Sequence, residues 1–180
     1  MDMTRTIEVE PYKSDWPEKY HHEARQLTQI FASQLISIHH IGSTAIPGIK
    51  AKPVIDIMVV VHEIDQVEQY NSSMIGLGYS PRGEYGIPGR RYFPKIIDDV
   101  HSHHVHVYGQ GHKDITRLLN FRDYLRDHPE QALAYSQLKE KLAQKFRYDS
   151  AGYTEAKTDF VKNINLLAAQ WREQQHAADD

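Results

Sequence analysis

The densest hydrophobic stretch of the chain is residues 54–61, VIDIMVVV, in which every position except Asp56 is apolar. Side chains alternate between the two faces of a strand, so this stretch is apolar on both faces. Strands of this kind lie in the middle of a sheet that is covered on both sides. A charge is costly there unless it is paired, hydrogen-bonded or bound to a cation. Asp56 is therefore the first candidate for a functional residue.

The pattern before this stretch predicts a short strand over 7–12, a helix and a second strand. Ser14 and Asp15 can cap the helix, whose apolar positions recur at helical spacing: Trp16, Tyr20, Ala24, Leu27 and Phe31. Glu23 falls on this apolar stripe; we favour the rim of the buried face for it, with a specific partner as the alternative. Residues 35–41 then alternate as a strand, and Pro53 opens the apolar strand.

After the apolar strand, residues 63–76 predict a helix and the Gly- and Pro-rich residues 81–89 favour a mobile flap. Residues 90–95 lead into a strand, Asp98 and Asp99 mark a turn, and residues 103–108 predict the next strand. His104, His106 and Tyr108 share one face of that strand, whereas we place His101 and His103 in the preceding loop.

From Lys113 onward the periodicity is helical only, with a break at His128–Pro129 and a frayed tail after Trp171. The fold class is therefore α+β with an α/β-like character: a small mixed sheet, flanking helices and three C-terminal helices. We expect one domain over 1–180, with the sheet in 1–111 and the C-terminal helices in 112–176.

Composition narrows the choice of function. The 180 residues contain no cysteine, which excludes disulfides and thiolate metal sites, and the net charge of -3 gives no strong nucleic-acid signal. The longest apolar run is too short to span a bilayer and the N-terminus lacks an apolar signal core, so we expect a cytoplasmic protein without a membrane partner. The sequence leaves the oligomeric state open.

The candidate chemistry gathers around the turn that precedes the apolar strand. Gly42 lets the backbone approach closely, and the hydroxyls and N–H groups of Ser43 and Thr44 can hold phosphate oxygens. The alternative for the turn is an ordinary loop, and for Asp56 a structural hydrogen bond to that turn. Further candidates for phosphate or substrate binding are His40, Lys52, Arg91 and Lys157.

Imidazole is a common ligand of Zn, Mn, Ni and Fe, so His104 and His106 are candidate metal ligands together with Asp56 and Glu23. The alternative for the two histidines is a half-buried structural role. Short histidine motifs match by chance often enough that this alternative stays open.

Several strings in the chain resemble the signature of the GrpB family, which is placed in the nucleotidyltransferase superfamily of the DNA polymerase beta type. The strings are HIGSTAIPG at 40–48, AKPVIDI at 51–57, His104-Val-His106, FRDYL at 121–125, YSQLK at 135–139 and YTEAK at 153–157. The resemblance implies a Gly-Ser turn after one strand and metal-binding acidic residues on the next. Here Met58 stands where a second carboxylate is usual, and histidines occupy the later strand that usually carries a third.

Three functions follow from this reading. The first is a nucleotidyltransferase that depends on a divalent metal, Mg or Mn before Zn or Ni, with Asp56 as its catalytic carboxylate and an acceptor that the sequence leaves open. The second is a non-catalytic module that binds a nucleoside triphosphate or another phosphorylated small molecule, which accounts directly for Met58. The third is a metal-dependent hydrolase built on Asp56, His104 and His106.

Overall fold

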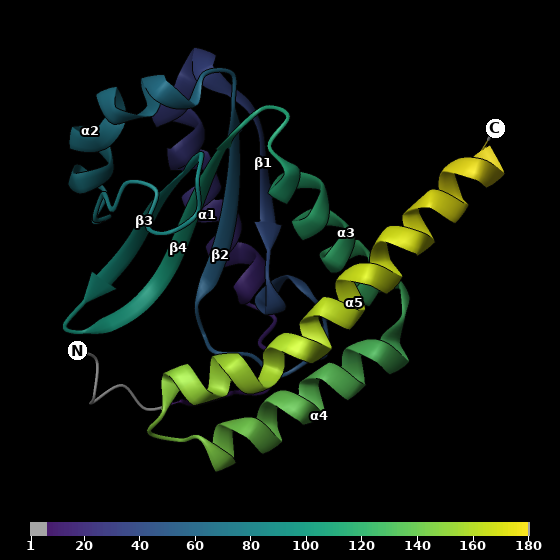
Figure 1. Cartoon of the computed structure of the whole chain (residues 1–180). Coiled ribbons are helices and arrows are strands. Elements are labelled where there is room, and N and C mark those ends of the chain that lie inside the picture. The colour runs from purple at the N-terminus through teal and green to yellow at the C-terminus, as the bar shows by residue number, and fades with distance from the viewer. Residues whose placement is uncertain (1–6, 180) are drawn as a thin grey trace. The chain divides into compact units, whose positions relative to one another are not determined.

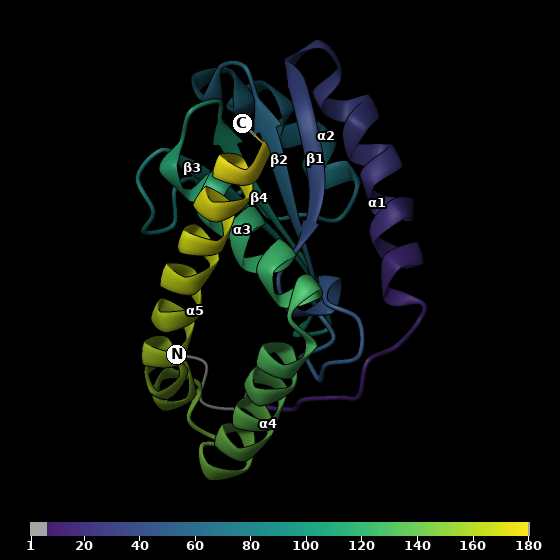
Figure 2. The same cartoon turned by 90° about the vertical axis from the view of Figure 1, so that its right-hand side faces the viewer.

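The computed structural model describes residues 7–179, which form two compact units (Figures 1 and 2). One unit contains residues 13–45 and 54–115 and holds the sheet; we call it the sheet unit. The other contains residues 7–12, 46–53 and 116–179 and is mainly helical; we call it the helical unit. The expected division at 111/112 lies near the boundary at 115/116, but residues 7–12 and 46–53 join the later helices.

The sheet unit follows the hydrophobic pattern closely. Its elements, in chain order, are α1 (Trp16–Phe31), η1 (Ala32–Gln34), β1 (Leu35–Ile41), η2 (Ser43–Ala45), β2 (Ile55–Val61), η3 (Ile64–Tyr70), α2 (Asn71–Gly76), β3 (Arg90–Ile97) and β4 (Val100–Gly109). The strand order is β1-β2-β4-β3; β2 and β4 are parallel, and the other two pairs are antiparallel. The apolar strand β2 is therefore central, as its sequence predicts.

The register of the strands defines two faces of this sheet. Helix α1 runs along β1 and β2 (Figure 2), and its Tyr20 stacks on His40 with ring centroids 4.9 Å apart. His40 pairs with Ile57, and Ile57 pairs with Val105, so these three residues share the face that we call the helix face. Asp56 and its β4 partner His104 lie on the opposite face, which we call the histidine face.

The helical unit contains α4 (Pro129–Lys145), α5 (Ser150–Asp179) and most of α3 (Lys113–Asp127). Helices α4 and α5 lie side by side and run in opposite directions (Figures 1 and 2). Buried side chains from 46–49 and from all three helices form one core; they are Ile46, Ile49, Tyr124, Leu125, Ala132, Tyr135, Ile164 and Ala168. Pro129 begins α4 because its missing N–H costs nothing in the first turn of a helix.

Several expected elements differ in the structure. Residues 7–12 form no strand and make a single bridge, Glu10 to Ala51. The helix expected over 63–76 is divided into η3 and α2. His101 and His103 lie within β4, because pairing with β3 extends that strand, and α5 continues past Trp171 to Asp179. The turn at Asp98–Asp99 is confirmed: both residues have positive φ, as tight hairpin turns require.

No helix within residues 7–179 has the length and apolar character that crossing a membrane demands.

Candidate functional site

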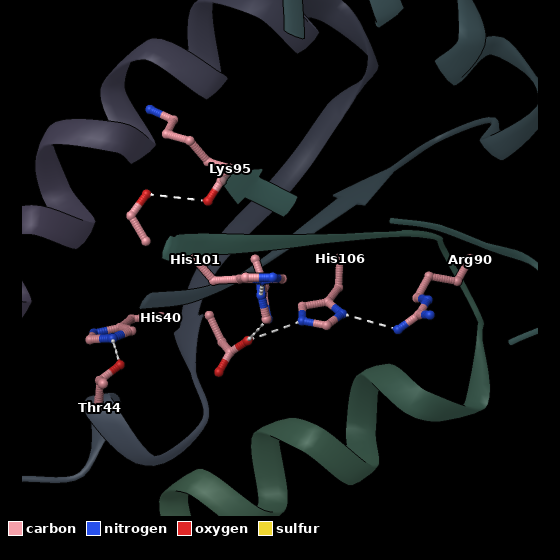
Figure 3. Close-up of polar contacts among 9 residues, drawn as sticks. His40, Thr44, Arg90, Lys95, His101 and His106 are labelled. Carbon is pink, nitrogen blue, oxygen red and sulfur yellow. Dashed lines mark hydrogen bonds and ion pairs between the residues drawn. The ribbon is translucent and has the colours of Figure 1, made fainter. Parts of the chain in front are cut away.

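Asp56 lies on the histidine face of the central strand, with 29% of its side chain exposed. The parallel register places it beside His104 of β4. Its Oδ1 atom is 3.2 Å from Nε2 of His106 and 3.7 Å from Nδ1 of His104 (Figure 3). The central strand thus carries a carboxylate that meets two imidazoles from its neighbour, as the shared face of His104 and His106 predicts.

Gly42 explains how the turn after β1 reaches this carboxylate. Its φ is +75°, and a Cβ atom added there would lie 2.6 Å from Oδ2 of Asp56. Only glycine satisfies both conditions, the left-handed backbone and the close approach. Ser43 follows in η2, where the Ala45 N–H donates to the Gly42 carbonyl at 3.1 Å. The structure therefore brings Gly42, Ser43, Asp56, His104 and His106 to one place in the sheet unit.

Arg90 is a member of this cluster that the sequence did not single out. It is 7% exposed, and its guanidinium donates to Nδ1 of His106 at 3.3 Å (Figure 3). It also donates to the carbonyls of Tyr85 at 2.9 Å and Glu84 at 3.3 Å, and it lies 4.8 Å above the ring of Tyr92. The sequence feature that could have identified Arg90 is the alternation of side chains along β3, which places Arg90 and Arg91 on opposite faces. The register with β4 then decides which of the two lies on the histidine face.

His101 extends the cluster at its other end. The register between β3 and β4 shifts between Lys95 and Ile96, so His101 returns to the histidine face. Its Nδ1 lies 2.8 Å from Nε2 of His104. A continuous polar chain thus runs from Arg90 through His106, Asp56 and His104 to His101.

Of the predicted site residues, Arg91 and Glu23 lie away from this cluster, on the helix face. Arg91 pairs with Glu68 and with Asp65 at 3.4 Å, both on η3. Glu23 is 4% exposed, accepts a hydrogen bond from Tyr79 at 2.8 Å and pairs with Lys95. The favoured position for Glu23, at the rim of the buried face, is therefore wrong, and the alternative of a specific partner is confirmed.

The pKa values within the Glu23 group show how firmly it is held. Burial alone would raise the pKa of Glu23, but hydrogen bonds from Lys95 and Tyr79 and the charge of Lys95 outweigh it and hold this pKa below its ordinary value. Burial and the nearby carboxylate raise the pKa of Tyr79 well above its usual range. This carboxylate is ionised, and its ion pair with Lys95 fastens α1 to β3.

His40 and Thr44, both predicted near the phosphate, bond to each other on the α1 side. Nε2 of His40 lies 2.9 Å from Oγ1 of Thr44 (Figure 3), and both residues are buried. The stack of His40 on Tyr20 fixes the ring. These contacts favour a structural role in holding the turn, and phosphate binding by these two side chains stays a prediction.

Lys52 and Lys157 lie in the helical unit, where the structure brings them together. Their ammonium groups lie 4.6 Å and 5.1 Å from the ring centroid of Tyr153, which is buried. Burial raises the pKa of the Tyr153 phenol. Lys139, which the sequence did not single out, is also buried in this unit, 4.7 Å from the Tyr135 ring. Phosphate binding by Lys52 and Lys157 stays a prediction.

The residues around Asp56 do not fit a pair of divalent metals. Two-metal phosphoryl chemistry needs carboxylates that bridge both ions. Met58, two residues after Asp56, is fully buried, and the neighbouring strand offers imidazoles in place of acids. Within residues 7–179, no group of three or more His, Asp or Glu side chains is arranged to hold a metal ion.

Comparisons with known proteins found a matching family and related sequences. The sequence model of one family, described as GrpB protein, matches residues 6–166. The UPF0157 protein YqkA of Bacillus subtilis is 41% identical over 175 residues, which cover 97% of this chain and 51% of YqkA. The chain therefore spans about half the length of that relative.

Two solved structures bear on the fold. The crystal structure of the conserved protein GrpB from Enterococcus faecalis matches with a TM-score of 0.88 at 37% identity, covering 92% of this chain and 99% of that one. A structure of a cytoplasmic RNA terminal U-transferase matches with a TM-score of 0.53 at 14% identity, covering 81% and 47%. The second likeness concerns the fold alone, and it agrees with a sheet of the nucleotidyltransferase type.

Proposed function

The chain belongs to the GrpB family, and we propose that its sheet unit binds a phosphorylated small molecule, with nucleoside triphosphates as the first class to test. The observation that carries the proposal is the contact between Gly42 and Asp56. It sets a Gly-Ser turn directly against a partly exposed carboxylate and two imidazoles on the central strands of a nucleotidyltransferase-type sheet.

The polar groups around this contact suit a phosphate. Ser43 is partly exposed, and its hydroxyl and backbone N–H can donate to phosphate oxygens. A phosphate beside Asp56 needs a compensating positive charge. Arg90 lies on the same face and carries a permanent positive charge. Because side chains can supply this charge, we expect binding with little or no requirement for a metal.

The second candidate is nucleotidyl transfer that depends on a divalent metal. It is favoured by the position of Asp56, on the central strand and beside the Gly-Ser turn. Met58 counts against it, because it leaves one carboxylate where two ions would need several. The two candidates differ in what they require of the metal.

A thermal-shift panel tests both candidates. The nucleoside triphosphates, each alone and with Mg²⁺, Mn²⁺, Zn²⁺ or Ni²⁺, are added to wild type and to Asp56→Ala. Asp65→Ala is the matched control, because Asp65 is an 88% exposed carboxylate that pairs with Arg91 on the helix face. A ligand at 100 times its dissociation constant stabilises the folded state by about 2.7 kcal/mol.

We expect a triphosphate to stabilise wild type and Asp65→Ala without metal, and to stabilise Asp56→Ala at least as strongly, because loss of that carboxylate removes its repulsion of the phosphate. Stabilisation that needs Mg²⁺ or Mn²⁺ and disappears in Asp56→Ala would instead support nucleotidyl transfer and justify a search for the acceptor. A panel in which no triphosphate shifts the wild type would contradict nucleotide binding.

A further inference from the structure

Arg90 is a buried cation with an unusual acceptor. Its guanidinium reaches a ring nitrogen of His106, whose other ring nitrogen faces the carboxylate of Asp56. We infer that Arg90 is a positioning residue: it donates to one ring nitrogen of His106 and so keeps the proton on the other, which donates to Asp56. Arg90 thereby keeps a divalent metal from using His106 as a ligand. The inference rests on the proposed function only in taking the histidine face as the ligand site.

The tautomer of His106 follows from the chemistry of its two neighbours. A guanidinium carries N–H donors and no acceptor, and it stays protonated in proteins. Nδ1 of His106, 3.3 Å from the Arg90 guanidinium, must therefore accept. In a neutral imidazole the proton then lies on Nε2, 3.2 Å from Oδ1 of Asp56. The Nε2–H group donates to the carboxylate, so both ring nitrogens of His106 are used.

This arrangement has a consequence for metal binding. A metal binds an imidazole nitrogen through its lone pair, and the group bonded to the other nitrogen decides which lone pair is available. Histidine ligands usually donate the second N–H to a carboxylate or a carbonyl, whereas His106 faces a cation there. The only lone pair that His106 offers is directed at Arg90. A metal beside Asp56 would have to displace Arg90 before His106 could join it.

Arg90 also ties the loop before β3 to the site. Two further N–H groups, on Nε and Nη2, donate to the carbonyls of Glu84 and Tyr85, and Tyr85 holds a positive φ of 49°. The Glu84 side chain accepts from the N–H of Gly89 at 2.6 Å. Lysine could replace one of these bonds but not the planar set of donors, because a guanidinium reaches several acceptors at fixed angles.

The test is a direct measurement of the His106 tautomer in ¹⁵N-histidine-labelled full-length protein without ligand. Long-range ¹H–¹⁵N correlation spectra at about pH 8, above the ordinary histidine pKa of about 6.5, distinguish the two neutral tautomers. The signals of His106 are those missing from His106→Gln. The variants are Arg90→Met and Arg90→Lys, and the control is Arg91→Met, because Arg91 pairs with η3 on the helix face.

We expect the Nε2–H tautomer in wild type, Arg90→Lys and Arg91→Met, and a mixture or the Nδ1–H tautomer in Arg90→Met. An Nδ1–H tautomer in wild type would overturn the inference, and that spectrum decides even if Arg90→Met fails to fold. A tautomer that does not change in a folded Arg90→Met would overturn it as well.

Zinc titration tests the second half of the inference. Removal of Arg90 frees His106 to turn a lone pair toward Asp56 and His104, so we expect Arg90→Met to bind Zn²⁺ more tightly than wild type, on the order of tenfold. Arg91→Met should match wild type. Equal Zn²⁺ affinity in Arg90→Met and wild type would refute the exclusion of metal. Neither measurement uses a nucleotide, so its outcome is independent of the thermal-shift panel.

Discussion

The two faces of the sheet each carry a carboxylate among histidines and basic residues, and the two carboxylates differ in burial. Glu23 on the helix face is 4% exposed and is held by Tyr79 and Lys95. Asp56 on the histidine face has a side chain that is 29% exposed; it contacts His106 and His104 and leaves no room for a Cβ atom at Gly42. The same residue types therefore serve different purposes on the two faces.

The difference shows which polar cluster can accept a ligand. A buried carboxylate that is neutralised by a cation and hydrogen-bonded by a phenol is shielded from ligands in solution, and its partners hold the fold together. A partly exposed carboxylate that meets imidazoles can exchange those contacts for a ligand. Burial and partners, more than residue type, therefore separate the structural group from the candidate site.

Glu23→Gln is the change with the largest expected effect on this comparison. It leaves the charge of Lys95 in the helix face without its counter-ion, and breaking a buried pair in this way costs about 3 to 5 kcal/mol. Urea unfolding measures the loss. The matched variant is Asp56→Asn, which should cost less than about 1 kcal/mol because that side chain is partly solvated. Equal losses in the two variants would remove the distinction between the faces.

Local pattern was enough to predict most of the fold. Apolar spacing identified α1, β1 and β2, and Pro129 marked the break between α3 and α4. The errors lie where long-range pairing decides. Residues 7–12 contain a strand-like pattern, but within them only Glu10 forms a bridge, to Ala51. His101 lies in β4 because β3 pairs with it, which a polar stretch does not reveal by itself.

The candidate site was predictable where it depends on one strand and its adjoining turn. The pattern of β2 isolates Asp56, and a glycine beside a serine marks the turn that contacts it. The choice between Arg90 and Arg91 depends on the register of β3 against β4, which sequence alone does not supply. That register places Arg90 on the histidine face, and its shift between Lys95 and Ile96 places His101 there as well.

Gly42→Ala is expected to cause the second-largest loss of stability, because it adds a methyl group where Gly42 approaches Asp56 on the histidine face. The left-handed backbone alone costs a non-glycine residue about 1 to 2 kcal/mol. The new methyl group would also have to displace the carboxylate of Asp56. Gly111→Ala is the matched control: its φ is +85°, but nothing lies within 4 Å of an added Cβ atom.

Thermal unfolding of the two variants gives the test. Gly42→Ala should lose more stability than Gly111→Ala and should also lose the nucleotide-dependent shift that the panel is designed to detect. Equal losses in the two variants would mean that Asp56 moves aside freely, and the close approach would then have no structural cost.

The smallest expected effect is the pH dependence of the helix face. Burial lowers the pKa of His103 to about 4, with Glu23 raising it and Lys95, Lys19 and His22 lowering it. The unfolded chain, with a histidine pKa of about 6.5, therefore binds the proton first as pH falls, so stability decreases between about pH 6.5 and pH 4. Glu23, whose pKa lies below its ordinary value, stays ionised over most of this window and adds its own loss of stability at lower pH.

Urea unfolding at each pH measures the effect. We expect the free energy of unfolding to fall by on the order of 1 kcal/mol between pH 7.5 and 5.5, and by less in His103→Gln. If His103→Gln kept the full loss, His103 would not be the group that titrates, and the helix face would not be the acid-sensitive part of the sheet unit.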